Sequence, residues 1–249
     1  MAERPPLSPG PSPAEGRGEF LNIAGLQAFY GESHILHGVD LTVNRGEVVT
    51  LLGRNGAGRT TTLKSILGLV GKRTGSIRIS GVESVAMSPH KIARMGIGYC
   101  PEERGIFASL SCEENLLLPP AVDSGGMGVD EIYAMFPNLK ERRSSPGTRL
   151  SGGEQQMLAV ARILRTGAKL LLLDEISEGL APVIVQALAR TIRMLREKGL
   201  TIVMVEQNFR FAAPLADRFY VMEHGRIVVR FAAAELEAKR PMLHEYLGV

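Results

Sequence analysis

Residues 51–60 read LLGRNGAGRT, a glycine-rich loop that directly follows an apolar run. Gly53 and Gly58 have the spacing of a phosphate-binding loop, in which Gly, any four residues and Gly are followed by Lys and then Ser or Thr. Thr60 completes this pattern, whereas Arg59 occupies the position of the lysine. A glycine-rich turn that binds no ligand is the alternative interpretation of the loop taken alone.

The residues on either side of the loop predict a strand before it and a helix after it. Residues 47–53 (EVVTLLG) are almost wholly apolar, which is typical of a central strand covered on both faces. After the loop, apolar side chains recur at helical spacing, at Leu63, Ile66, Leu67 and Val70. A tight glycine turn between a strand and a helix directs backbone N–H groups and the helix dipole at one point, where an anion is favoured.

The rest of the chain alternates apolar strands with helical patterns. Buried strands are predicted at 96–101, 169–175 and 200–206, long helices at 152–166 and 183–198, and a closing hairpin at 218–230. Residues 39–44 alternate apolar and polar side chains as a half-exposed strand does. Residues from about 103 to 150 are helical and interrupted by glycines and look like an insertion. This order predicts an α/β fold with a parallel sheet, preceded by antiparallel β-structure.

The composition is that of an ordinary globular protein, with 45% apolar and 22% charged residues and a formal net charge of +3. A charge of this size does not argue for a nucleic-acid partner. No stretch reaches the roughly 18 consecutive apolar residues of a membrane-spanning helix. Cys100 and Cys112 match no metal-ligand spacing, so we expect buried thiols in a reducing compartment. Residues 1–18 contain five prolines and three glycines and are predicted to be a disordered leader.

A second motif, LLLLDEISEGLAP at 170–182, places two carboxylates at the end of an apolar strand. Ligands of open α/β sheets bind at this edge, beyond the carboxyl ends of the strands. Asp174 is therefore a candidate ligand of Mg²⁺, and Glu175 is a candidate for polarising an attacking water. Two solvated carboxylates that simply follow a strand are the alternative.

A third motif, LSGGEQQ at 150–156, begins a helix. Ser151 and Glu154 form an S-x-x-E capping box, which by itself needs no ligand. Gly152 and Gly153 fall in the first helical turn, where each glycine costs up to ~1 kcal/mol relative to alanine. Two glycines at this position favour an interpretation in which an anion approaches the backbone closely.

GRNGAGRT, LSGGEQQ and LLLLDE, in this order, resemble the motifs of the ATP-binding subunits of ABC transporters. The resemblance extends from about residue 20 to residue 249. PEERGIFASLSCEENLLL, EIYAMFPNLKERR, SEGLAP and VEQNFRFAAPLADRFYVMEHG look more narrowly like the branch that imports branched-chain amino acids. Importers of urea and short amides share much of this pattern.

The resemblance implies a fold and a division of the chain. The fold is α/β, a P-loop NTPase core with a mostly parallel sheet of the ABC ATPase type. An antiparallel β subdomain and a helical signature subdomain accompany this core. After the leader at 1–18, residues 19–249 would form the ATP-binding domain, with the helical subdomain at about 103–165.

The resemblance also assigns roles to single residues. The residues expected to contact ATP are Tyr30, which would stack on adenine, Gly53, Arg54, Asn55, Gly56, Ala57, Gly58, Arg59, Thr60 and Thr61 of the loop, and Ser151, Gly152, Gly153 and Glu154 of the signature. Thr60, Asp174 and Glu102 are the expected Mg²⁺ ligands. Glu175, Gln207 and Glu102 are the expected catalytic residues.

Several of these positions depart from the commonest pattern of the family. Glu102 stands where most members have glutamine, Gln207 where most have the switch histidine, and Ile176 where proline is usual. The first two replacements resemble the branched-chain branch itself. An amide can hydrogen-bond a phosphate oxygen, although it cannot accept a proton as histidine does.

Arg59 is the departure with the largest expected effect. Arginine keeps the positive charge and binds phosphate well, but its planar fork is wider than an ammonium group. We expect nucleotide binding to persist in weakened form and hydrolysis to fall, since Thr60, Asp174 and Glu175 are all present. A nucleotide-binding module that has lost catalysis is the alternative.

The resemblance implies ATP and Mg²⁺ as cofactors and a site shared between two ATP-binding subunits. Residues 177–180 would contact the second subunit, in a homodimer or a heterodimer. The other implied partners are membrane-embedded permease subunits and, indirectly, a periplasmic solute-binding protein, at the cytoplasmic face of the inner membrane. A soluble ABC protein of DNA repair or translation is a further alternative, although such chains usually carry paired nucleotide domains, zinc modules or coiled coils.

Overall fold

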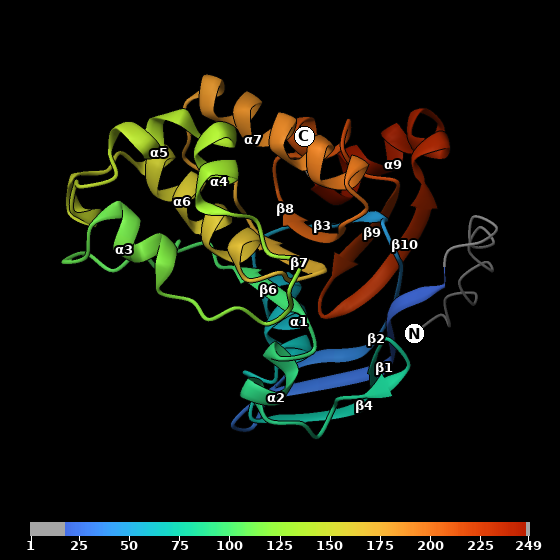
Figure 1. Cartoon of the computed structure of the whole chain (residues 1–249). Coiled ribbons are helices and arrows are strands. Elements are labelled where there is room, and N and C mark those ends of the chain that lie inside the picture. Colours follow the sequence, from blue (N-terminus) through green and yellow to red (C-terminus); the bar gives the residue numbers. More distant parts are fainter. Residues whose placement is uncertain (1–17, 248–249) are drawn as a thin grey trace, which may run out of the picture.

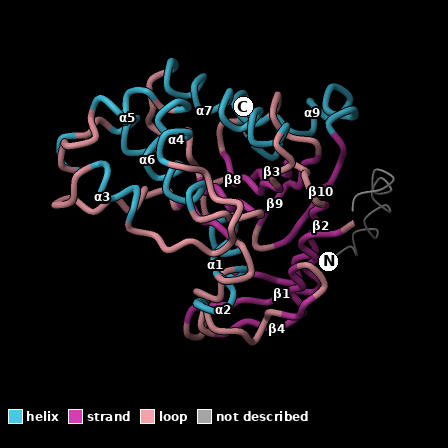
Figure 2. Tube along the Cα trace, viewed as in Figure 1, coloured by secondary structure: helices cyan, strands magenta, loops and turns pink. Residues whose placement is uncertain are grey.

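The computed structural model describes residues 18–247. Nearly all of the leader predicted at 1–18 therefore lies outside the described residues. The described chain folds into two β-sheets with helices between them and on the outer face of the larger sheet (Figures 1 and 2). The predicted α/β class is confirmed.

The larger sheet has six strands in the order β10-β9-β3-β8-β7-β6. Their bounds are β3 Val48–Gly53, β6 Ile97–Cys100, β7 Leu170–Asp174, β8 Thr201–Glu206, β9 Arg218–Glu223 and β10 Arg226–Ala232. All neighbouring pairs are parallel except β9 and β10, which form the predicted hairpin. Every residue of β3 is buried, which confirms that the strand before the glycine loop is central.

The smaller sheet has the order β2-β1-β4-β5 and is antiparallel throughout. Its strands are β1 Glu19–Tyr30, β2 Ser33–Asn44, β4 Lys72–Ile79 and β5 Val82–Glu83. The predicted strand at 39–44 is the second half of β2, which alternates as expected: Val39, Leu41 and Val43 are fully or almost fully buried.

Helix α1 (Arg59–Ile66) lies between the two sheets (Figure 1). Its N-terminus lies near the end of β3, because only the short glycine loop separates the two elements. Leu63 and Ile66 are fully buried in an apolar cluster that contains residues of both sheets. The helix ends before the predicted apolar position Val70. Gly68 adopts a left-handed backbone with φ 77°, and a side chain there would approach Ile92, so the chain turns at this glycine.

The other face of the larger sheet is covered by α6 (Gly152–Arg165) and α7 (Pro182–Glu197), as predicted (Figure 1). Successive residues of β8 face opposite layers: Ile202 and Met204 pack in the α6–α7 core, while Val203 and Val205 pack toward α1. The remaining helices are α2 Pro89–Ala93, α3 Cys112–Leu117, α4 Val129–Met135, α5 Pro137–Glu141, α8 Phe209–Ala212, α9 Leu236–Leu247 and the 3₁₀ turns η1 Gly147–Arg149 and η2 Ala233–Glu235.

The region between residues 103 and 150 contains α3, α4 and α5, which gather beside α6 (Figure 1). Cys100 and Cys112 are buried free thiols, as expected, and burial raises the pKa of Cys112 to about 11. Between residues 18 and 247, no helix combines the length and the apolar character needed to cross a bilayer.

Candidate functional site

The glycine loop forms an open cradle of backbone N–H groups at the start of α1. Gly56 and Gly58 have φ angles of 79° and 103°, which favour glycine. No side chain caps the first turn of α1, so its N–H groups keep the hydrogen-bonding capacity that an anion can use. Gly225, in the turn between β9 and β10, connects the loop to β2. Its N–H donates to the Ala57 carbonyl over 2.9 Å, and its carbonyl accepts from His37 N–H.

The cradle opens into a cavity of about 410 Å³. The residues that line it are Ile35, Asn55, Gly56, Ala57, Gly58, Arg59, Thr60, Thr61, Glu102, Glu175 and Glu178. The fold therefore brings the glycine loop to the residues that follow β6 and β7, as the shared edge of parallel strands predicts. The loop amides, which are candidates for binding phosphate, and the candidate metal ligands Thr60 and Glu102 meet in one cavity.

Arg59 is 4% exposed, and its guanidinium points at the carboxylate after β7. Nη2 donates to Glu175 Oε1 over 2.6 Å and to Asn55 Oδ1 over 3.1 Å. Nη1 is buried and has no hydrogen-bond partner among the described residues. A buried N–H of a charged group is costly when it is unpaired, so one arm of the guanidinium has the capacity to bind a phosphate oxygen.

Asp174 is held by two neutral donors. Thr60 Oγ1 donates to Oδ1 over 3.0 Å, and the Tyr99 hydroxyl donates to Oδ2 over 3.1 Å. Burial raises the pKa of Asp174, while these two hydrogen bonds oppose the rise. Thr60 and Glu102 line the cavity, and the Thr60 hydroxyl contacts the Asp174 carboxylate. Oxygen donors of this kind are the ones that Mg²⁺ prefers.

Glu175 occupies a left-handed backbone conformation with φ 48°, which is unusual for a residue with a side chain. Its N–H donates to the Val205 carbonyl over 2.9 Å, so the strained residue is pinned to β8. Burial and then the Glu178 side chain raise the pKa of Glu175 to about 7, against the opposing charge of Arg59. Carboxylate oxygens of Glu102, Glu175 and Glu178 lie within 4.8 Å of one another.

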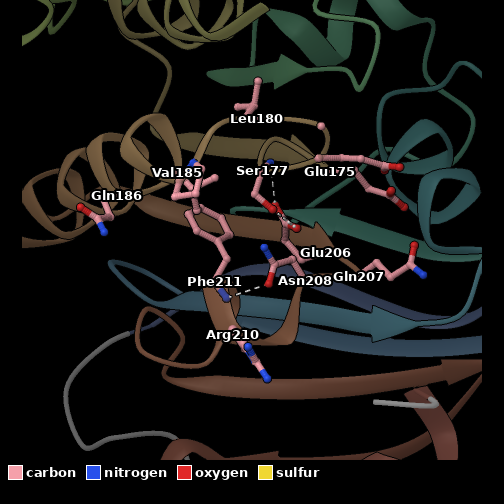
Figure 3. Close-up of a pocket in the computed structure, with 13 residues that line it drawn as sticks. Glu175, Ser177, Leu180, Val185, Gln186, Glu206, Gln207, Asn208, Arg210 and Phe211 are labelled. Carbon is pink, nitrogen blue, oxygen red and sulfur yellow. Dashed lines mark hydrogen bonds between the residues drawn. The ribbon is translucent and has the colours of Figure 1, made fainter.

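A second cavity of about 800 Å³ adjoins Glu175 on the side of α7 and α8 (Figure 3). Gln207 lines it from the residue after β8, and its exposed side chain extends to the same side of the view as Glu175. Beside them, the buried Ser177 and Glu206 are joined by two hydrogen bonds. Glu175 thus belongs to both cavities.

The signature residues form the predicted capping box at the start of α6. Ser151 Oγ accepts from Glu154 N–H over 3.3 Å, and Ser151 N–H donates to Glu154 Oε2 over 2.7 Å. None of these residues is among those that line the cavity of the glycine loop. Gly153 has a packing role within this chain, because a Cβ on it would lie 2.8 Å from Ile184 Cγ1. Packing against Ile184 is therefore by itself a reason for a glycine there.

Three other residues expected to contact nucleotide lie away from the cavity lining. Gly53 is tightly packed, since a Cβ there would lie 2.5 Å from the Met222 carbonyl oxygen. The Arg54 guanidinium donates to the main-chain carbonyls of Glu245 and Tyr246 in α9. Tyr30, at the end of β1, is 46% exposed, as an aromatic residue available for stacking would be.

Three residues in or beside the two cavities were given no individual role from the sequence. Tyr99 could have been found, because β6 pairs in parallel with β7 and directs its side chain at the neighbouring strand end. Glu178 follows Glu175 by one turn and shares its cavity. The buried position of Glu206 continues the apolar strand β8, and no spacing rule in the sequence marks it.

The fold and the cavity define a P-loop nucleotide-binding protein of the α/β class. The chain belongs to the ABC transporter family, whose family model, described as ABC transporter, matches residues 36–178. It is an ATP-binding subunit of this family of ATPases.

Named relatives match nearly the whole chain. The high-affinity branched-chain amino acid transport ATP-binding protein BraG of Pseudomonas aeruginosa is 42% identical over 92% of this chain and 99% of its own length. The probable branched-chain amino acid transport ATP-binding protein LivF of Archaeoglobus fulgidus is 36% identical, over 87% and 93% respectively. A solved ATP-binding subunit of an ABC transporter superimposes with a TM-score of 0.75 at 29% identity, covering 90% of this chain and 93% of that one.

Proposed function

We propose that this chain binds and hydrolyses ATP to energise an importer of branched-chain or related amino acids. The observation that carries the proposal is the cavity in which the glycine loop meets Glu175, with Asp174 hydrogen-bonded to the Thr60 side chain of that loop. The likeness to BraG and LivF supports the substrate class. Related importers of urea and short amides are the alternative, since selectivity resides in other polypeptides.

In this proposal the loop residues and α1 bind the triphosphate, and Thr60, Asp174 and Glu102 hold Mg²⁺. The fit is supported by the orphaned Nη1 of Arg59 and by the uncapped first turn of α1. Bound Mg²⁺ would neutralise charge on the phosphates. Tyr99 keeps Asp174 oriented for this task through its hydroxyl.

Glu175 orients and polarises the attacking water in its ionised form, and Gln207 donates its amide to the terminal phosphate. Before this, the Glu175 carboxylate must leave Arg59, with which it is paired. Arg59 then has both arms for phosphate oxygens. Breaking the ion pair between Arg59 and Glu175 costs free energy before each turnover. We therefore propose that turnover at this site is lower than with a lysine at position 59.

Ser151, Gly152, Gly153 and Glu154 act on the nucleotide of a second ATP-binding subunit in this proposal. Their separation from the glycine-loop cavity supports an action across a dimer. A heterodimer would allow the intact signature of this chain to complete a faster site on its neighbour. The chain would then bind peripherally to permease subunits at the cytoplasmic face of the inner membrane, and a periplasmic solute-binding protein would act indirectly.

The test is release of γ-phosphate by the purified chain together with its partner subunits. Glu175→Gln is expected to lower turnover by at least ~100-fold while labelled ATP still binds. Glu141→Gln, on the exposed surface of α5, is the matched control and should leave turnover unchanged. Full turnover in Glu175→Gln would show that catalysis occurs in the partner subunit and would favour the alternative in which this chain binds nucleotide without hydrolysing it.

A detergent pull-down with the full chain tests the partners. Co-purification of membrane proteins and of a second ATP-binding subunit is expected. Recovery of DNA-repair or translation components in their place would contradict the transport assignment.

A further inference from the structure

Glu206, the last residue of β8, is a carboxyl group that is 1% exposed. Among residues 18–247, the hydrogen bonds to its side chain come from one residue, the 4% exposed Ser177. Ser177 N–H donates to Oε1 over 3.2 Å, and Ser177 Oγ bonds Oε2 over 2.8 Å (Figure 3). Burying a carboxyl group without an adjacent cation is expensive, so an apolar residue would stabilise the strand end better. The glutamate therefore has a task other than stability.

The two anchors of the strained Glu175 backbone are consecutive residues of one strand. On the N-terminal side, Glu175 N–H donates to the Val205 carbonyl. Two residues further on, Ser177 is tied to the Glu206 side chain. A left-handed residue with a side chain persists only when its surroundings fix it from both sides. Val205 and Glu206 supply these two fixed points.

The two residues that follow Glu206 in sequence connect the anchor to the rest of the site. Gln207 follows directly and is exposed in the same cavity as Glu175. Asn208 then caps α8, with its Oδ1 accepting from Phe211 N–H over 3.2 Å (Figure 3). The segment is therefore held on both sides of Gln207, by the loop after β7 and by α8.

We propose that Glu206 is a positioning residue that fixes the catalytic geometry of Glu175, by holding the loop at Ser177 to the end of the strand that Gln207 follows. This inference rests on the proposed function for its catalytic consequence. The anchor itself is a property of the chain and is testable without turnover. Burial raises the pKa of Glu206 to about 8, so the protonated carboxyl predominates at neutral pH and forms both hydrogen bonds to Ser177 without a buried charge.

The variants separate hydrogen bonding from volume. Glu206→Gln keeps a carbonyl for Ser177 N–H and supplies an amide N–H for Ser177 Oγ. Glu206→Met has a similar unbranched shape but forms neither bond. Ser177→Ala removes one of the two bonds with little loss of volume and serves as a second test from the other side of the pair.

The first measurement is amide hydrogen exchange of the peptide that contains residues 175–180 in the full chain. We expect at least ~10-fold faster exchange in Glu206→Met, a smaller increase in Ser177→Ala, and a rate near that of the wild type in Glu206→Gln. Equal exchange in the wild type and both Glu206→Met and Ser177→Ala overturns the anchor. Equal acceleration in Glu206→Gln and Glu206→Met overturns it too.

The second measurement is ATP turnover with the partner subunits. In Glu206→Met, kcat is expected to fall ~10-fold with KM changed less than ~2-fold, and Glu206→Gln should recover most of kcat. A kcat in Glu206→Met equal to that of the wild type overturns the positioning role. If the wild-type chain hydrolyses no ATP in any combination, the proposed function fails, while the exchange result still decides the anchor.

Discussion

Arg59 Nη2 and Glu175 Oε1 lie 2.6 Å apart, although the two residues are 116 positions apart in the chain. The cation expected to bind phosphate and the carboxylate expected to polarise water are thus bound to each other, with side chains 4% and 9% exposed. Removing one partner of such a buried pair is strongly destabilising, because the other charge is then left buried without its partner. Any ligand that recruits the guanidinium must also release the carboxylate.

Arg59→Lys is expected to raise ATP turnover by at least ~10-fold in the complex with partner subunits. Lysine concentrates its charge at one atom on a thin stem and lacks the guanidinium whose Nη2 donates to both Glu175 and Asn55. The measurement is γ-phosphate release at saturating ATP. Arg190→Lys, at an exposed position of α7, is the control. Unchanged turnover in Arg59→Lys would make arginine a full substitute for lysine.

Tyr99→Phe is expected to weaken the dependence of nucleotide binding on Mg²⁺. The change removes the hydroxyl that donates to Asp174 Oδ2 and leaves one oxygen of this carboxylate without its donor. Because ligand orientation by neighbouring groups typically contributes ~10-fold or more to metal affinity, the Mg²⁺ concentration for half-maximal binding of labelled ATP should rise ~3- to 10-fold.

The control for Tyr99→Phe is Tyr133→Phe, which removes a hydroxyl that donates to Glu113 in the helical region. This variant should not alter the Mg²⁺ titration. The same midpoint for Tyr99→Phe and the wild type would show that Thr60 alone orients Asp174.

Gly153→Ala is expected to lower the free energy of unfolding by ~1–3 kcal/mol, since its Cβ would lie within 3.1 Å of three side-chain carbons of Ile184. Urea unfolding measures this change. Adding Ile184→Ala removes all three carbons, so the double variant should be destabilised by less than the sum of the two single changes. Strictly additive values would contradict the packing explanation of this glycine.

The double variant also separates packing from binding. If Gly153→Ala with Ile184→Ala folds normally but no longer forms an ATP-dependent dimer, the glycine is needed for approach of the anion. Normal dimer formation leaves packing as its role.

The central sheet could be predicted from sequence because its strands are apolar on both faces. β7 and β8 read as continuous apolar runs, and each alternates between the two core layers. The glycine loop was equally visible, since its spacing is local. The end of α1 was missed, because the apolar periodicity continues to Val70 while Gly68 turns the chain.

Contacts between distant segments could not be predicted in the same way. Nothing local indicates that Arg59 pairs with Glu175, because the contact depends on how β3 and β7 are placed in one sheet. The packing of Gly153 against Ile184 depends on how α6 and α7 lie together. The sequence favoured the approach of an anion as the explanation of Gly153, and the structure offers packing against Ile184 as another explanation.

Glu206→Gln is expected to make stability less sensitive to pH. Burial raises the pKa of Glu206 from its ordinary 4.5 to about 8, with Glu175 adding to the rise and Ser177 and Arg59 opposing it. Between these two values the folded chain keeps a proton that the unfolded chain has released. Since the unfolded state binds fewer protons there, the contribution of Glu206 to stability falls as pH rises from about 4.5 to about 8.

Urea unfolding of the wild type and Glu206→Gln at pH 5 to 9 measures this effect. The two proteins should differ least near pH 5, and Glu206→Gln should become more stable by on the order of 2 kcal/mol by pH 8.5, since one pKa unit corresponds to ~1.4 kcal/mol and relaxation recovers part of the cost. Glu141→Gln, at the exposed end of α5, controls for loss of a surface charge. A difference that is constant across this range, or that grows toward acid pH, would mean that Glu206 is ionised in the folded protein at neutral pH.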